Sequence, residues 1–134
     1  MAQNLKIGSD ICSVGRIKVV YEKYGERFLN RVLTDREKAY VQSKAASNVA
    51  SPAQRISQAL AARFAAKEAV VKALGTGWRG LYWKEVEIVN AQSGAPQVNL
   101  YGRAKGLFTK LGFDHIEISL SHEHEYALAM VIMY

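Results

Sequence analysis

The residues best suited to chemistry in this chain are two carboxylates that stand among apolar neighbours. Glu68 lies in an Ala- and Val-rich stretch, four residues after Phe64 and four residues before Lys72. Residues four apart share a face of an α-helix, so this carboxylate interrupts a row that begins as core. Burying it is costly unless a metal ion or a cation pairs with it. The alternative is a surface Glu68–Lys72 pair worth about 0.2–0.5 kcal/mol.

The second carboxylate, Asp10, interrupts the strand-like segment 6–11. It could cap the helix that follows, or it could join Glu68 in one site. Mg²⁺ takes few protein oxygens and keeps waters and substrate phosphates in its remaining positions. Two carboxylates from separate elements could therefore hold Mg²⁺, and Asp10 and Glu68 are the candidate metal ligands.

A glycine-rich segment, 75–80, follows the helix that carries Glu68. It matches G-x-G-x-x-G, but it follows a helix and precedes a strand, which is the reverse of a dinucleotide site, so we reject a Rossmann interpretation. The backbone N–H groups of Gly75, Thr76 and Gly77 could still cradle phosphate. Alternatively, the turn only ends the helix.

Near the C-terminus, Ser119 and Ser121 share one face of a predicted strand beside His122, and these groups could bind phosphate oxygens. His122 and His124 would also share a face if the segment is extended, which is a weak signal for a transition metal. A polar hairpin tip is the simpler interpretation of the two histidines.

The elements that must position these residues are one strand, several helices and then mostly β hairpins. The expected helices are 14–24, a short turn after Gly25, a helix begun by the capping box 34–37, the long helix 52–74 and the short helix 102–111. The expected strands are 5–12, 83–89, 97–101, 115–122 and 126–134. This order favours an α+β fold in which an antiparallel sheet packs against a long central helix and shorter helices.

Composition limits the class of protein. The chain has 134 residues, which predicts a single domain over 1–134, and its 49% hydrophobic and 22% charged content is typical of a globular protein. No apolar run approaches the roughly 20 residues of a membrane span. The first residues lack a signal-peptide pattern and Cys12 is the only cysteine, so we expect a cytoplasmic protein. The net charge of +6 favours an acidic partner: nucleic acid, a phosphorylated small molecule or an acidic protein.

Taken together, these segments resemble the holo-acyl-carrier-protein synthase family, the small 4′-phosphopantetheinyl transferases. The resemblance rests on the G-x-D-I strand 7–11, the central segment 63–77 and the S-x-S-H strand pair around 119–129. It spans essentially the whole chain. One departure is the segment 44–58, which is longer and more polar than the family pattern leads us to expect.

The resemblance implies a reaction in which a serine of an apo acyl carrier protein attacks coenzyme A, receives the phosphopantetheine arm and releases 3′,5′-ADP. It implies that Asp10, Glu68 and Lys72 are catalytic, with Mg²⁺ held by the two carboxylates and Lys72 reaching the same phosphates. Glu68 or a bound water could take the serine proton. The implied coenzyme A contacts are Arg63, Lys67, Lys72, Gly75, Thr76, Gly77, Ser121 and His122.

The resemblance also implies partners. Carrier proteins are acidic, so we expect Arg16, Lys18 and Lys23 to dock one. Family members similar to this chain form homotrimers with sites between subunits, and we expect neither nucleic acid nor membrane as a partner. The alternatives are a non-enzymatic RNA-binding module, whose seven tyrosines could stack on bases, and another Mg²⁺-dependent phosphotransferase.

Overall fold

The computed structural model describes residues 4–46 and 51–134. The strands are β1 (Lys6–Ser13), β2 (Val86–Asn90), β3 (Pro96–Leu100), β4 (Ile116–His122) and β5 (Tyr126–Met133). The helices are α1 (Val14–Tyr24), α2 (Glu26–Val32), α3 (Asp35–Ser43), α4 (Pro52–Leu74) and α5 (Gly102–Lys110). All strand pairs are antiparallel, so the expected α+β fold is confirmed.

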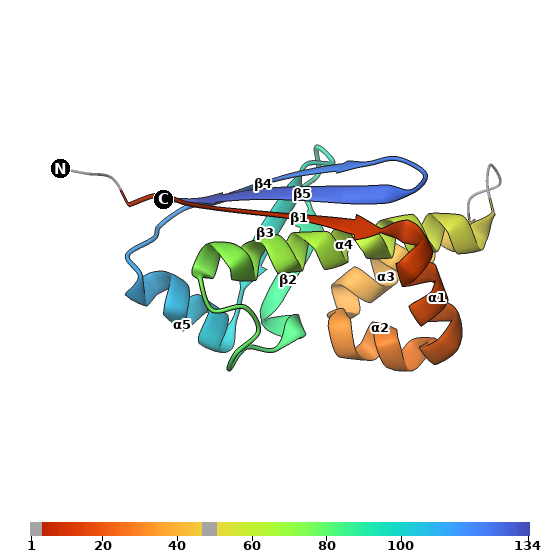
Figure 1. The fold of residues 1–134 in the computed structure, drawn as a ribbon, viewed down its shortest axis with the longest axis horizontal. Helices are drawn as coiled ribbons and strands as arrows, with labels where there is room; N and C mark the ends of the chain where they lie inside the picture. Colours follow the sequence, from red (N-terminus) through yellow and green to blue (C-terminus); the bar gives the residue numbers. More distant parts are fainter. Residues whose placement is uncertain (1–3, 47–50) are drawn as a thin grey trace.

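The long helix α4 lies along one face of a sheet with the strand order β1-β5-β4 (Figure 1). Small side chains on that face let the helix approach closely, since Cys12, Ala127 and Ala129 are all buried. The approach is tightest at Gly8, where an added Cβ would lie 2.0 Å from the carbonyl oxygen of Ala69. The glycine therefore sets the spacing between β1 and α4, the two elements that carry the candidate carboxylates.

The opposite face of this sheet is apolar but open. We call Ile7, Ile11, Leu128 and Met130 the outer sheet face; their exposed fractions are 67%, 63%, 45% and 53%. Ile11 pairs directly with Leu128 across β1 and β5. Since side chains alternate along a strand, these residues are the outward partners of the buried ones against α4.

Helices α1, α2 and α3 gather at one end of α4 (Figure 1). Ser13 caps α1 by accepting a hydrogen bond from the Arg16 N–H at 3.2 Å, so the interpretation of Asp10 as the helix cap is wrong. Gly25 ends α1 as expected, with φ at 54°. The predicted capping box of Thr34 and Glu37 starts α3.

The second sheet, β2 and β3, differs from the expected one at its start. A 3₁₀ turn over Trp83–Glu85 replaces the first part of the predicted strand. Strand alternation puts Glu87 on the face opposite Val86 and Ile88, yet all three are buried and the exposed fraction of Glu87 is only 3%. Burial raises the pKa of the Glu87 carboxyl, but hydrogen bonds from Thr34, Asn99 and Tyr101 outweigh this and hold the pKa below its usual range.

The segment 44–58 is described only in part, because residues 47–50 lie outside the described residues. Its described parts are a 3₁₀ turn over Lys44–Ala46 and the first turns of α4. Across residues 4–46 and 51–134, no helix combines the length and the apolar character needed to cross a membrane.

Candidate active site

Asp10 and Glu68 line the same cavity, although they are 58 residues apart in the chain. We call it the acidic cavity; it has a volume of about 420 Å³, and Arg16 and Phe64 also line it. Asp10 lies on the face of β1 that meets α4, between the buried residues Gly8 and Cys12. Glu68 lies on the side of α4 next to that strand, and both carboxylates are half-buried. The predicted convergence of the two acidic residues is thus present in the fold.

Each carboxylate has one oxygen engaged in a hydrogen bond. The Lys72 ammonium donates to Oδ1 of Asp10 at 2.9 Å and to the Ser9 carbonyl at 3.0 Å. Trp78 Nε1 donates to Oε1 of Glu68 at 3.0 Å. The second oxygen of each carboxylate accepts no hydrogen bond from any residue in the described ranges, so it remains available to a ligand. The surface Glu68–Lys72 pair is absent from the described chain, because Lys72 pairs with Asp10.

Cys12 lies in the wall of the same cavity. Burial raises the pKa of its thiol to about 11, and the negative charge of Asp10 adds to the effect. Arg16 opposes this shift, while Glu68 reinforces it. The thiol is therefore protonated at neutral pH, as expected for a small core residue rather than a nucleophile.

The two carboxylates suit Mg²⁺ better than a transition metal. Within residues 4–46 and 51–134, no three or more His, Cys, Asp or Glu residues gather in a way that could hold a metal ion. Mg²⁺ needs only one or two carboxylates when waters and substrate phosphates complete its coordination. Asp10 and Glu68 line one cavity, and each keeps one oxygen that accepts no hydrogen bond from the described residues, which meets that requirement. The weak transition-metal signal at His122 and His124 gains no third ligand in the described chain.

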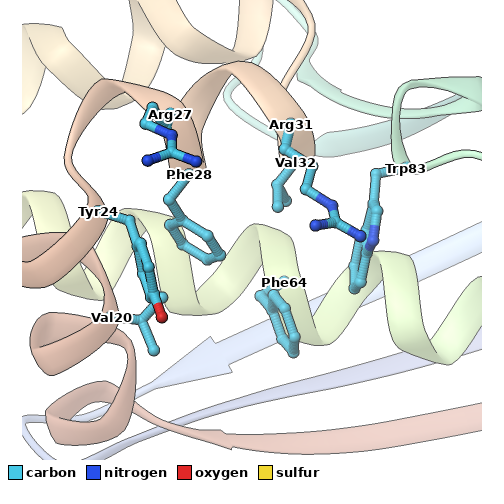
Figure 2. Close-up of a pocket in the computed structure, with 8 residues that line it drawn as sticks. All are labelled: Val20, Tyr24, Arg27, Phe28, Arg31, Val32, Phe64 and Trp83. Atoms are coloured by element: carbon cyan, nitrogen blue, oxygen red, sulfur yellow. The ribbon is translucent and has the colours of Figure 1, made fainter.

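A second cavity adjoins the first, and both are lined by Val20, Phe28 and Phe64. It has a volume of about 620 Å³. Figure 2 shows Phe28 pointing from α2 towards Phe64 on α4, with the Arg31 guanidinium beside the Trp83 ring and the Arg27 guanidinium above Tyr24 and Phe28 in this view. The acidic pair therefore opens onto a groove whose walls are aromatic and whose rim is basic.

A third cavity, of about 540 Å³, brings together Arg63 and His122, two of the predicted coenzyme A contacts. Lys44, Arg55 and His124 also line it. Arg63 and Glu68 are five residues apart on α4, so their side chains leave the helix about 140° apart. Within one chain, Asp10 and Glu68 thus line one cavity, and Arg63 and His122 line another.

Arg63 is held firmly at the edge of this third cavity. Its guanidinium carbon lies 3.9 Å from the centre of the Tyr40 ring, and Nη2 donates to Oδ1 of Asn90 at 2.7 Å. Burial lowers the pKa of the guanidinium, while Tyr40 and Glu37 favour the charged form. The Nε atoms of Arg55 and Arg63 are buried and have no hydrogen-bond partner among the described residues. Buried donors without partners fit an anionic ligand at this cavity.

Lys67 does not fit its predicted role as a coenzyme A contact. Its side chain is fully buried, and its ammonium forms an ion pair with Glu37 at 2.8 Å. It also donates to the carbonyl groups of Trp83 and Val86. Burial lowers the pKa of the Lys67 ammonium, and the Glu37 carboxylate opposes that shift. Lys67 therefore ties α4 to α3 and β2, which is a structural role that a helix pattern alone does not reveal.

The glycine-rich turn and Ser121 lie outside the three cavities. Gly75 ends α4 in the left-handed conformation, and its N–H bonds back to the carbonyl groups of Val71 and Lys72. The turn therefore does end the helix, and its contact with phosphate stays a prediction. Ser121 is exposed and lies on the strand face opposite His122, next to Leu128 of the outer sheet face.

The predicted docking residues all lie on α1, but they differ in surroundings. Arg16 lines the acidic cavity, Lys18 is half-buried, and Lys23 is exposed beside the Tyr24 ring at 5.3 Å. The sequence patterns did not single out Arg27 and Arg31, which line the adjoining groove, or Trp78, which donates a hydrogen bond to Glu68. The two arginines are four residues apart in α2 on either side of Phe28, a helical spacing that could have revealed a basic rim.

Comparisons with known proteins agree with the resemblance seen in the sequence. The sequence model of the 4′-phosphopantetheinyl transferase superfamily matches residues 6–131. A holo-[acyl-carrier-protein] synthase of Gloeobacter violaceus is 44% identical over 126 residues, which cover 94% of this chain and 89% of that protein.

Two solved structures share the fold. An acyl carrier protein synthase of Plasmodium yoelii, solved with ADP bound, has a TM-score of 0.83 and 32% identity and covers 98% of this chain and 97% of its own. The Helicobacter pylori holo-[acyl-carrier-protein] synthase, solved in complex with coenzyme A, has a TM-score of 0.78 and 28% identity and covers 96% of this chain and 99% of its own.

The family match and the shared fold thus make this chain a member of the 4′-phosphopantetheinyl transferase superfamily. Within it, the chain belongs to the holo-acyl-carrier-protein synthase family. It is an enzyme, and this sets aside the alternative of a non-enzymatic RNA-binding module.

Proposed function

We propose that this enzyme transfers the 4′-phosphopantetheine group of coenzyme A to a serine of an apo acyl carrier protein and releases 3′,5′-ADP. The observation that carries the proposal is the convergence of Asp10 and Glu68 on one cavity. Relatives named for this reaction, and one solved with coenzyme A, provide the substrate class.

In the proposed reaction, the serine hydroxyl oxygen forms a bond to the phosphorus next to pantetheine. The bond from that phosphorus to the bridging oxygen breaks, and 3′,5′-ADP leaves with that oxygen. The serine proton passes to Glu68 or to water. Asp10 and Glu68 would hold Mg²⁺, which when bound neutralises charge on the diphosphate.

The chain's own residues supply positioning and positive charge. Lys72 holds Asp10 in place at 2.9 Å and adds a positive charge beside the phosphates. Arg16 lines the same cavity and adds another. Gly75, Thr76 and Gly77 are further candidates for backbone contacts with phosphate. Phosphoryl transfer needs such charge neutralisation and alignment more than covalent help.

We further propose a homotrimer in which neighbouring subunits complete each site. Two observations support it. The apolar outer sheet face, with Ile7 and Met130 more than half exposed, suits burial against copies of this chain. In addition, Arg63 and His122 line a different cavity from Asp10 and Glu68, so a neighbour is needed to bring one set to the other. A monomeric mass in light scattering at micromolar protein contradicts the trimer.

For the carrier protein, we propose docking on α1 and α2 beside the acidic cavity. Arg16, Lys18 and Lys23 belong to this surface, together with Arg27 and Arg31 on the rim of the adjoining groove. The net charge of +6 favours an acidic partner, chiefly through its association rate and orientation.

The test is incubation of the purified chain with apo carrier protein, coenzyme A and Mg²⁺, followed by mass spectrometry. We expect the mass of the carrier protein to rise by one phosphopantetheine and 3′,5′-ADP to appear in equal amount. A carrier protein of unchanged mass beside a folded enzyme contradicts the proposal. Transfer of bare phosphate indicates a different Mg²⁺-dependent phosphotransferase.

A further inference from the structure

Trp78 lies against the candidate metal ligand Glu68, and no part of the proposed reaction yet uses it. Its indole Nε1 donates a hydrogen bond to Oε1 of Glu68 at 3.0 Å. An indole nitrogen is a donor only, so this contact has one direction. Each carboxylate has two oxygens, and the hydrogen bond to Oε1 leaves Oε2 of Glu68 for another ligand.

The backbone reverses direction after α4 and thereby brings this indole back to Glu68. Glu68 lies six residues before the end of α4 at Leu74, which is about 9 Å along the helix axis. Trp78 follows that end, so the chain must fold back to reach Glu68. Gly75 and Gly77 both have positive φ, 86° and 58°, and residues other than glycine rarely adopt such backbone conformations. The glycine-rich turn therefore serves to return Trp78 to the acidic cavity.

A stack of three aromatic rings holds the indole in position. The Trp78 and Trp83 rings lie 3.9 Å apart, and the Trp83 and Phe64 rings lie 4.9 Å apart. Phe64 lies one helical turn before Glu68 and lines the same cavity. The stack thus packs Trp78 against Trp83, and Trp83 against a residue one helical turn from Glu68.

From this geometry we propose that Trp78 is a positioning residue that fixes the Glu68 carboxylate for the divalent cation through its indole N–H. This inference rests on the proposed function, because it assumes that Glu68 binds the cation. Outer hydrogen-bond partners of metal ligands orient those ligands, and their loss typically lowers metal affinity by about 10- to 100-fold. Trp78→Phe removes the N–H but keeps an aromatic ring for the stack.

The first test reads the hydrogen bond without metal or activity. The chain has two tryptophans, so its ¹H–¹⁵N spectrum should show two indole signals, and Trp83→Phe assigns the remaining one to Trp78. We expect Glu68→Gln to shift the Trp78 signal and to leave the Trp83 signal in place. An unmoved Trp78 signal overturns the inference.

The second test measures Mn²⁺ affinity by electron paramagnetic resonance, since Mn²⁺ prefers the same oxygen ligands as Mg²⁺. We expect Trp78→Phe to bind Mn²⁺ about 10- to 100-fold more weakly than the wild type. The control Trp83→Phe changes the stack and keeps the N–H donor, so its affinity should stay near the wild-type value.

The two failures are distinguishable. If Glu68→Gln loses Mn²⁺ affinity and Trp78→Phe does not, the positioning role is wrong and the proposed function stands. If Glu68→Gln keeps wild-type affinity, Glu68 is not a metal ligand, and both the metal assignment and this inference fall. If Trp78→Phe and Trp83→Phe lose Mn²⁺ affinity to the same extent relative to the wild type, the role of the N–H is wrong and the effect belongs to the ring stack.

Discussion

The Lys72 ammonium lies 2.9 Å from Oδ1 of Asp10, and this ion pair joins α4 to β1 at the edge of the acidic cavity. The lysine side chain is 52% exposed and the aspartate side chain 17%. A pair with one partner in solvent adds little to stability, about 0–1 kcal/mol. Because the pair lies beside the candidate metal ligand, we propose that its main role is in the reaction.

We therefore expect Lys72→Ala to lower kcat by about 10- to 100-fold, which corresponds to loss of one charged hydrogen bond of about 1.5–3 kcal/mol. The free energy of unfolding should fall by less than about 1 kcal/mol. Steady-state kinetics and urea unfolding measure the two effects, with Lys110→Ala on α5 as an exposed control. Unchanged turnover with a large loss of stability would show that Lys72 is purely structural.

Gly8→Ala tests the close approach of β1 and α4. The added Cβ would lie 2.0 Å from the Ala69 carbonyl oxygen and 2.9 Å from the Ala73 nitrogen, so the strand must move away from the helix. Such overpacking destabilises a fold by about 1–3 kcal/mol or more. It should also separate Asp10 from Glu68 and reduce turnover.

The matched control is Gly106→Ala in α5, where the added Cβ meets no atom within 4 Å. Alanine in a helix is more favourable than glycine by about 0.5–1 kcal/mol, so this variant should be as stable as the wild type or more so. Thermal and urea unfolding of both variants check the contrast. Equal stability of Gly8→Ala and the wild type would be incompatible with the described packing.

The Cys12 thiol should be unreactive at neutral pH. Burial and the nearby Asp10 charge raise its pKa to about 11, so the thiolate forms only in strongly alkaline solution. The folded state keeps this proton when the unfolded chain has already lost it. Above about pH 9, stability from this group is therefore expected to decline as pH rises.

The measurement for Cys12 is the rate of iodoacetamide alkylation as a function of pH, with the urea-unfolded chain as the reference. We expect slow modification of the folded protein below pH 9 and rapid modification of the unfolded chain. Fast alkylation of the folded protein at pH 7 would refute the buried, protonated thiol.

The basic rim formed by Arg27 and Arg31 should control carrier-protein association. Charge reversal with Arg27→Glu or Arg31→Glu is expected to raise KM for the carrier protein and to leave KM for coenzyme A near its wild-type value. The effect should diminish as salt increases, because charge steering is screened over about 10 Å at 0.1 M ionic strength. The control Arg103→Glu lies on α5, outside the docking surface. An equal rise in KM in that control indicates a general charge effect.

Local signals predicted much of this fold. Helix α1 and its end at Gly25, the capping box of α3 and the bounds of α4 all agree with the expected positions, because caps and helical periodicity are encoded by neighbouring residues. Asp10 and Glu68 could also be identified, since each is a charge in an apolar run.

The remaining features depend on contacts between distant segments. Glu87 lies on the face of β2 opposite Val86 and Ile88, and hydrogen-bond partners from the N-cap of α3 and from β3 make its burial favourable. Lys67 was expected at the ligand, but Glu37 lies 30 residues away in the chain and pairs with it in the core. The Trp78–Glu68 contact requires two positive-φ glycines to turn the chain back. Periodicity along one element contains no information about such partners.

The most direct test of the account is the anomalous diffraction of a crystal grown with coenzyme A and Mn²⁺. We expect one anomalous peak per acidic cavity, within coordination distance of an oxygen of Asp10 and an oxygen of Glu68, with the diphosphate bound to the same ion. A cation that contacts only one of these carboxylates, or neither, would contradict the shared metal site.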